Sequence, residues 1–234
     1  MTLLQHPLYA LLSVSVTQAY KLDKKLDVSN FLSSFDFLWL LYDDEHDGDF
    51  YSEIDIVESV SYLTRNEITL HNNPNECTMT AEKGTGDVFS TNCDYDAGGC
   101  GVYAPYGTFG DSFNKNGGGV WATQVEAEGI KIWYFAKSAI PTDINSESPD
   151  PSKWGTPVMS FVPQNCDIRN TWKKMKIINN ITFCGESAGG EAWNTYTQCR
   201  SQTGVASCNE YVAKTPSAFD EVYFLINSIK TFSK

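Results

Sequence analysis

Short apolar runs, separated by glycine- and proline-rich turns, fill most of the chain after residue 52. The turns include Gly84–Asp87, Gly98–Gly99, Gly117–Gly119 and Pro149–Pro151. Runs of this length that are rich in β-branched and aromatic residues predict an all-β sandwich. We expect short helical turns only around residues 189–199 and 207–214. The segments expected to form strands are Ile68–Leu70, Val120–Val125, Ile130–Ala136, Lys176–Phe183 and Val222–Phe232.

One of the candidate strands, Glu53–Glu58, carries three carboxylates within six residues, interleaved with Ile and Val. Alternate residues of a strand face opposite sides, so Glu53 and Asp55 share a face and Glu58 has the wrong parity. One inserted residue, a β-bulge, would turn Glu58 onto the same face, and bulges are common beside active sites.

Carboxylates gathered on one face repel one another, and this raises the pKa of at least one of them. Hydrolysis of a glycosidic bond with retention needs such a set: an ionised nucleophile and a protonated general acid. The alternative interpretation is an exposed acidic edge strand, because carboxylates are mostly solvated and this chain is acidic throughout.

Charge and length restrict the classes of partner. The chain has 234 residues and a net charge of −12, which suits one domain with a sizeable core. This charge argues against nucleic acid or an anionic membrane as partner and is compatible with a neutral polysaccharide. After the N-terminal region no apolar run approaches the ~18 residues of a membrane span. We expect a monomer with no cofactor and no metal.

The N-terminal region predicts secretion. Residues 1–19 contain no Asp, Glu, Lys or Arg, and a short apolar run is followed by Thr17 and Ala19, small residues suited to a cleavage site. We expect a signal peptide over residues 1–19, an extracellular protein and a domain over residues 20–234; a buried N-terminal strand or helix is the alternative. The one N-glycosylation sequon, at Asn180, is consistent with secretion.

The seven cysteines favour disulfides in a secreted chain. Zinc is disfavoured because no C-x-x-C spacing occurs and the histidine before Cys77, His71, is six residues away. Seven is odd, so one thiol lacks a partner within the chain, and the connectivity stays open. The cysteines are Cys77, Cys93, Cys100, Cys166, Cys184, Cys199 and Cys208.

A second catalytic pattern competes with the carboxylates. The run Gly185–Gly189 fits the G-x-S-x-G nucleophile elbow of serine esterases, with Ser187 as the nucleophile. That α/β-hydrolase arrangement requires a histidine later in the chain, and the last histidine is His71. Ser187 therefore lacks an activating base, and we interpret this run as a glycine-rich loop after a strand.

The acidic strand resembles the E-x-D-x-x-E signature of glycoside hydrolase family 16, in its fungal laminarinase-like branch, over about residues 53–232. Further stretches match in order: Thr69–His71, Gly118–Val120, Ile130–Trp133, Ile140–Pro141, Pro151–Ser152, Trp154–Gly155, Cys166–Ile168 and Phe183–Gly185. The resemblance implies a β-jelly roll with a concave cleft, and a retaining endo-1,3(4)-β-glucanase.

The same resemblance implies roles for individual residues. Glu53 would be the nucleophile, Asp55 its electrostatic assistant and Glu58 the acid/base. His71 would contact substrate beside the nucleophile, whereas a buried core histidine is the alternative. Trp121 and Trp133 are candidate sugar platforms, although tryptophans are more often core. A catalytically silent glucan-binding sandwich and a transglycosylase of the same family remain alternative functions.

The region before the acidic strand departs from the family. Tyr20–Leu22 and Asn30–Phe37 resemble the start of the mature domain, but the Trp-rich run of strands that the family places before the signature is absent. In its place stand Leu38–Tyr42 and the acidic turn Asp43–Asp49, which fits the frame of a calcium loop only loosely. We therefore expect a sandwich that is incomplete on its N-terminal side, with the catalytic strand near a sheet edge.

Overall fold

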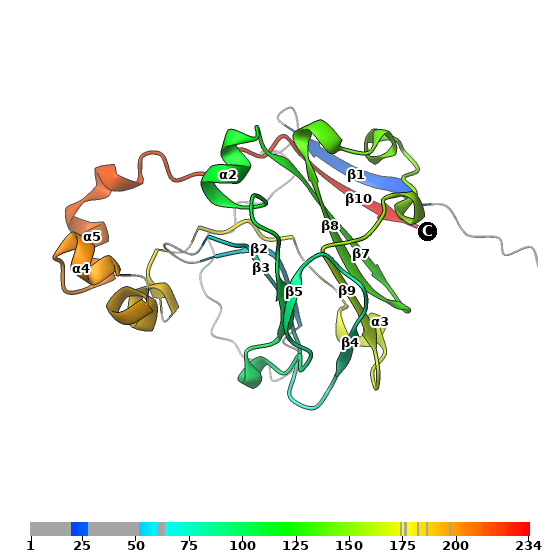
Figure 1. Cartoon of the computed structure of the whole chain (residues 1–234), viewed down its shortest axis with the longest axis horizontal. Helices are drawn as coiled ribbons and strands as arrows, with labels where there is room; N and C mark the ends of the chain where they lie inside the picture. Colours follow the sequence, from blue (N-terminus) through cyan, green and yellow to red (C-terminus); the bar gives the residue numbers. More distant parts are fainter. Residues whose placement is uncertain are drawn as a thin grey trace, which may run out of the picture.

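The computed structural model describes residues 20–27, 52–59, 64–173, 175, 177–181, 183–185, 187–196 and 198–234. The predicted signal peptide, Leu38–Tyr42 and the acidic turn Asp43–Asp49 lie outside these residues. The described part of the chain forms two four-stranded antiparallel sheets and a separate pair of strands, which confirms the all-β prediction (Figure 1). None of its helices is long and apolar enough to cross a membrane.

The first sheet carries the acidic strand at one edge. Each neighbouring pair in this sheet is antiparallel. Within the described residues β2 pairs with β3 alone, and the predicted position of the catalytic strand near a sheet edge stays a prediction. In spatial order the strands are β2 (Glu53–Glu58), β3 (Glu67–His71), β6 (Cys100–Tyr103) and β5 (Asp87–Ser90).

The second sheet packs against the first around the main core. Its strands, in spatial order, are β4 (Met79–Ala81), β9 (Met159–Pro163), β8 (Gly129–Ala136) and β7 (Gly119–Glu126). Alternate residues of β3 and β8 point inward, so Ile68, Leu70, Ile130 and Ile132 are fully buried in one cluster with Phe161. The alternation that the sequence shows is therefore the alternation of a two-layer sandwich.

A third pair of strands joins the two ends of the described chain. Strand β1 (Lys21–Asp27) lies antiparallel to β10 (Ser228–Ser233). Before it, the Tyr20 hydroxyl donates to the Glu126 carboxylate at the end of β7. These contacts hold the N-terminal segment against the second sheet (Figure 1).

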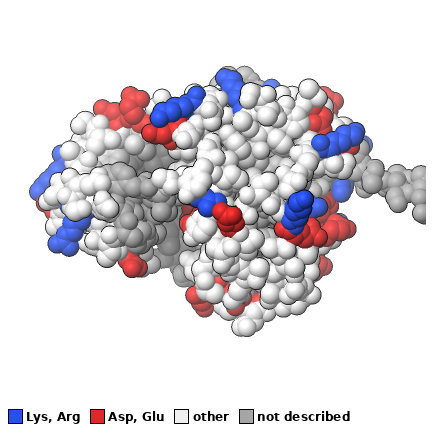
Figure 2. Space-filling model, viewed as in Figure 1, with Lys and Arg blue, Asp and Glu red and all other residues white. Residues whose placement is uncertain are grey.

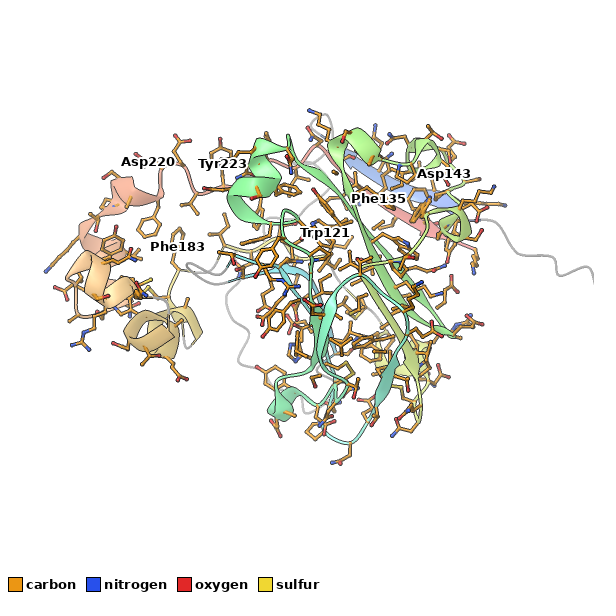
Figure 3. The ribbon with its side chains drawn as sticks, in the orientation of Figure 1. Trp121, Phe135, Asp143, Phe183, Asp220 and Tyr223 are labelled. Carbon is orange, nitrogen blue, oxygen red and sulfur yellow. A yellow bond between two sulfur atoms is a disulfide. The ribbon has the colours of Figure 1, made fainter. Side chains whose placement is uncertain are left out.

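Short helices cover the outer face of the second sheet. Trp133 and Phe135 of β8 form a second buried cluster with Ile144, and Trp154 packs edge-on against both rings. The indole of Trp154 donates to the Asp143 carboxylate at 3.0 Å, and Figure 3 shows Phe135 and Asp143 on this side of the sandwich. The covering helices are η2 (Lys137–Ala139), η3 (Thr142–Asn145) and η4 (Pro151–Lys153).

The remaining helices are also short, and several gather into a lobe beside the sandwich (Figure 1). The lobe has its own small core of Cys184, Trp193 and Cys208. It contains η5 (Ser187–Tyr196, kinked at Gly190), α4 (Cys199–Thr203), α5 (Cys208–Lys214) and η6 (Pro216–Phe219), as the predicted helical turns anticipated. Elsewhere lie η1 (Tyr95–Ala97), α2 (Gly110–Lys115) and α3 (Ile168–Thr171).

Six of the seven cysteines form disulfides, which confirms the disulfide prediction. Cys77–Cys166 joins the approach to β4 with the end of β9, Cys93–Cys100 closes the loop that holds η1, and Cys184–Cys208 closes the lobe. Cys199 lies outside these bridges. On the face that Figure 2 shows, Lys and Arg are scattered among Asp and Glu rather than gathered into a basic patch.

Two predicted strands differ from the structure. In Lys176–Phe183 the described residues, 177–181 and 183, lie outside any strand. In Val222–Phe232 the strand begins only at Ser228. A strand needs a neighbouring backbone to satisfy its amide groups, and no described segment pairs with 177–181 or 222–227. Apolar side chains of both stretches are exposed, among them Ile178, Tyr223 and Leu225, and Tyr223 lies on the connection between lobe and sandwich (Figure 3).

Candidate active site

The three carboxylates of β2 lie on one face of the first sheet. Glu53 stands opposite His71 and Asp55 opposite Thr69 in the register with β3. The intervening residues, Ile54 and Ile56, pack against the main core on the other face. This division follows from the period of two in a strand, and it leaves the acidic side chains on the face turned away from the core.

The predicted bulge is present. The register of β2 on β3 shifts between Asp55 and Glu58, so that Glu58 stands opposite Glu67. Three steps along β2 match only two along β3, which means that one extra residue is accommodated. Because Glu67, Thr69 and His71 alternate on one face of β3, the shift places Glu58 on the same face as Glu53 and Asp55.

The imidazole of His71 lies beside the carboxylates. Its Nε2 lies 3.3 Å from the Asp55 carboxylate, and both side chains are largely buried. Gly99 packs directly on the imidazole: a Cβ built there would lie 2.6 Å from Nδ1, and the backbone φ of +84 to +80° at Gly98 and Gly99 favours glycine. The loop closed by Cys93–Cys100 thus fixes the position of the His71 ring.

The proximity of these ionisable side chains shifts the pKa values of Glu53, Glu58 and His71. Partial burial of the Glu58 carboxyl is the largest cause that raises its pKa to about 7, and repulsion from Asp55 and Glu67 adds to it. Burial and then the charge of Asp55 raise the pKa of Glu53 as well, while His71 opposes this. The pKa of His71 is raised, chiefly by its hydrogen bond to Asp55. The site can therefore hold a proton on a carboxyl near neutral pH.

The predicted tryptophan platforms are not brought to this face. Both Trp121 and Trp133 belong to the second sheet. Trp133 is 3% exposed and donates to the Gly155 carbonyl at 3.1 Å, and Trp121 packs against the main core and the Tyr134 ring, inside the sandwich in Figure 3. The burial of Trp133 does not support contact with a sugar, whereas Trp121 is only partly buried and its substrate-binding role stays a prediction.

Other aromatic residues, which the sequence did not single out, lie on the carboxylate face. Tyr95 packs on the His71 ring at 5.5 Å and is half exposed. Tyr103 pairs with Glu67 in the register, and its ring contacts that of Phe89 at 5.0 Å. The register of β6 on β3 places Tyr103, and the loop that holds η1 places Tyr95, so neither position could be found before the strands are paired.

The esterase-like run takes no part in this site. Ser187 begins η5 in the helical lobe, outside the sheet that carries the carboxylates. The chain has no histidine after His71. Among the described residues no group of three or more His, Cys, Asp or Glu is arranged to hold a metal ion.

Comparison with known proteins agrees with the site. Residues 33–232 match the family model described as "XgeA-like, catalytic GH16 domain". The chain belongs to glycoside hydrolase family 16.

Two fungal proteins are similar to this chain over most of its length. A probable glycosidase of Schizosaccharomyces pombe is 42% identical over 202 residues, which cover 83% of this chain and 46% of that protein. The endo-1,3(4)-β-glucanase xgeA of Emericella nidulans is 36% identical over 183 residues, covering 77% of this chain and 29% of that protein. The chain thus spans less than half the length of these relatives.

Solved structures confirm the sandwich fold. An elongating family 16 β-1,3-glucosyltransferase superposes with a TM-score of 0.67 at 36% identity, covering 92% of this chain and 66% of the other. Laminarinase 16A from Phanerochaete chrysosporium, holding two β-glucans in donor and acceptor sites, gives a TM-score of 0.67 at 37% identity, covering 78% and 62%. At 36% and 37% identity, both proteins resemble this chain in sequence as well as in fold.

Proposed function

We propose that this chain is a secreted, retaining glycoside hydrolase that cleaves β-1,3 or mixed β-1,3/1,4 glucan. The observation that carries the proposal is the bulge in β2, which adds Glu58 to the face already occupied by Glu53 and Asp55. Three carboxylates on one face, one with a pKa of about 7, suit the pair of roles that retention requires.

In the proposed reaction Glu53 is the nucleophile and Glu58 acts first as general acid and then as general base. The Glu53 carboxylate attacks the anomeric carbon and forms a covalent glycosyl ester, while Glu58 donates its proton to the departing glycosidic oxygen. Glu58 then removes a proton from water, which attacks the same carbon and releases Glu53. Asp55 and His71 form a hydrogen-bonded pair beside the nucleophile, and His71, when protonated, favours ionised Glu53.

The protonation states set the pH range. Glu53 must be ionised and Glu58 protonated, so activity should rise as Glu53 loses its proton and fall as Glu58 titrates near pH 7. The result is a bell-shaped profile with its alkaline limb close to neutrality.

The glucan substrate is inferred from the relatives and from the surface. The named relatives include endo-1,3(4)-β-glucanases and a laminarinase bound to β-glucans. Tyr95 on one side of the carboxylates and Tyr103 with Phe89 on the other offer flat apolar rings. Such rings suit the apolar faces of glucose units.

A second candidate is transfer of the glycosyl group to another sugar. It is favoured by one observation: the solved structure that covers 92% of this chain is that of an elongating β-1,3-glucosyltransferase. The chemistry up to the glycosyl ester is identical, and only the acceptor differs. A silent glucan-binding sandwich is the remaining alternative.

Variants assayed on laminarin test the proposal. Glu53→Gln should abolish turnover. Glu58→Ala should lower it by about 100-fold or more, with partial rescue by azide, which attacks without a general base. Glu128→Gln is the matched control, because Glu128 is exposed in the turn between β7 and β8. Anomeric NMR of the products should show retention.

The outcomes separate the alternatives. Inversion at the anomeric carbon would overturn the assigned roles. Longer oligosaccharides from laminariheptaose would indicate transfer, and binding of laminarin with no turnover would indicate a silent sandwich. Secretion is tested by the N-terminal sequence of the protein from a secreting host, which should begin at Tyr20; an intact Met1 would contradict a cleaved signal peptide.

A further inference from the structure

The bulge that brings Glu58 onto the carboxylate face needs its own support. A bulge interrupts the ladder of backbone hydrogen bonds, and it leaves groups of the bulged strand without partners on the neighbouring strand. A buried amide group that goes without a partner destabilises the fold. The backbone between Asp55 and Glu58 therefore requires donors and acceptors from elsewhere.

The side chain of Asn66 supplies both. Its Oδ1 accepts the Glu58 backbone N–H at 2.8 Å, and its Nδ2 donates to the Ile56 backbone carbonyl at 2.8 Å. Asn66 is fully buried, immediately before β3. Its own carbonyl accepts the Ala104 N–H at 2.9 Å, which ties it to the residue after β6.

The chemistry of an amide suits this position. A carboxamide carries an acceptor and a donor side by side, like a peptide unit, and so it can continue the ladder across the extra residue. An aliphatic side chain would leave both backbone groups unpaired. A slip by one residue would turn every following side chain of β2 to the opposite face.

We propose that Asn66 is a positioning residue that holds the bulge of β2 and thereby keeps Glu58 on the carboxylate face. The inference deepens the proposed function, on which the acid/base role of Glu58 rests. Asn66 itself faces the backbone of β2 and does not reach the reacting atoms.

The protonation of Glu58 reports its position. The charged groups that influence it are Asp55 and Glu53 on its own strand and Glu67 and His71 on β3. Burial and the nearest carboxylates hold the proton on Glu58 only while its carboxyl lies among them. If Glu58 leaves that face, its pKa should fall toward the ordinary value of a glutamate.

A direct test is a titration of carboxyl carbons by NMR in the full chain, with Glu58→Gln to assign the signal. In Asn66→Ala the Glu58 titration should move to lower pH. Asn72→Ala is the matched control, because Asn72 is also fully buried, at the other end of β3, and its side-chain amide donates to the Cys77 carbonyl at 3.3 Å. It should leave the Glu58 titration in place. An unmoved titration in folded Asn66→Ala would overturn the inference.

Kinetics give a second readout that a general loss of stability would not produce. Asn66→Ala should lower kcat on laminarin by about 100-fold, as expected for a displaced general acid. Glycosyl ester formation from dinitrophenyl β-laminaribioside, whose leaving group needs no acid, should fall by less than about 10-fold. Equal losses on both substrates would contradict a positioning role.

A second variant covers the case in which Asn66→Ala does not fold. In Asn66→Asp the introduced carboxyl, while protonated, can both accept and donate as the amide does, and it loses the donor when it ionises. The alkaline limb of the activity profile should therefore move to lower pH. A profile identical to that of the wild type would overturn the inference.

The two proposals fail differently. If the wild-type chain turns over neither substrate while the Glu58 titration still depends on Asn66, the proposed activity is wrong and the positioning stands. If the wild type is active and neither Asn66 variant changes the titration or the substrate preference, the activity stands and the positioning is wrong.

Discussion

The sandwich and the helical lobe are stabilised in different ways. The sandwich buries the alternate residues of two sheets, with side chains such as Leu70 and Phe161 fully removed from water. The lobe has short helices around Trp193 and the Cys184–Cys208 bridge. Its helices contact one another, and the lobe stands beside the sheets rather than over them (Figure 1).

This contrast shows which interactions stabilise each region. A small unit buries too little apolar surface to offset its conformational entropy and depends on a covalent link. Ser207 begins α5 by accepting the Glu210 N–H, which adds a local cap. The sandwich relies on contacts between residues far apart in the sequence. The two regions should therefore respond to different perturbations.

The largest effect is expected from the sandwich core. Phe161→Ala removes a fully buried ring from β9 and should lower the free energy of unfolding by about 4 kcal/mol. Urea unfolding followed by near-UV circular dichroism measures it. Val125→Ala, at a half-exposed position of β7, is the control and should cost under about 1 kcal/mol. Equal losses would show that the cluster around Phe161 is not the main core.

A smaller and more local effect is expected in the lobe. Replacing Cys184 and Cys208 by Ser opens a loop of 24 residues and should destabilise the lobe by about 3 kcal/mol. Hydrogen exchange read by mass spectrometry should show faster exchange in α4 and α5, with β8 unchanged. Faster exchange in β8 as well would mean that lobe and sandwich unfold as one unit.

The smallest effect is expected at the acidic edge of the sandwich. The folded pKa of Glu58, about 7, lies above its unfolded value, so its stabilising effect is complete below the unfolded pKa and lost as pH rises through 7. Glu58→Gln should therefore stabilise the chain at pH 8 by about 1 kcal/mol, since solvent screens part of the effect. It should change little at pH 4.

Thermal melts at the two pH values measure this difference. Glu128→Gln, in the exposed turn between β7 and β8, is again the matched control and should change the melting temperature little. A gain for Glu58→Gln that is equal at both pH values would mean that the carboxyl titrates normally.

Much of the sandwich could be predicted from local pattern. The strands at Ile68–Leu70, Val120–Val125 and Ile130–Ala136 follow from alternation and turns, and their observed bounds differ by one or two residues. Lys176–Phe183 has the same composition, but strand formation depends on a partner that composition does not reveal. The sequence alone also does not reveal which face of a strand other residues cover, and for this reason the burial of Trp133 could not be predicted from strand alternation.

The candidate site was predictable in part for the same reason. The carboxylates of β2 are adjacent in the sequence, so their shared face and the bulge could be inferred from parity. Asn66, Tyr95 and Tyr103 lie at the site through tertiary contacts, and their neighbours in the sequence give no hint of them. The register of β6 on β3 places Tyr103, and the loop closed by Cys93–Cys100 places Tyr95.

The carboxyl groups of β2 also have a consequence for solubility. Charged side chains on a strand oppose the addition of another chain to a sheet. Glu53, Asp55 and Glu58 place three carboxyl groups close together along β2. Neutral variants made to silence the chemistry also weaken the repulsion between copies, so sedimentation of such variants should accompany their assays.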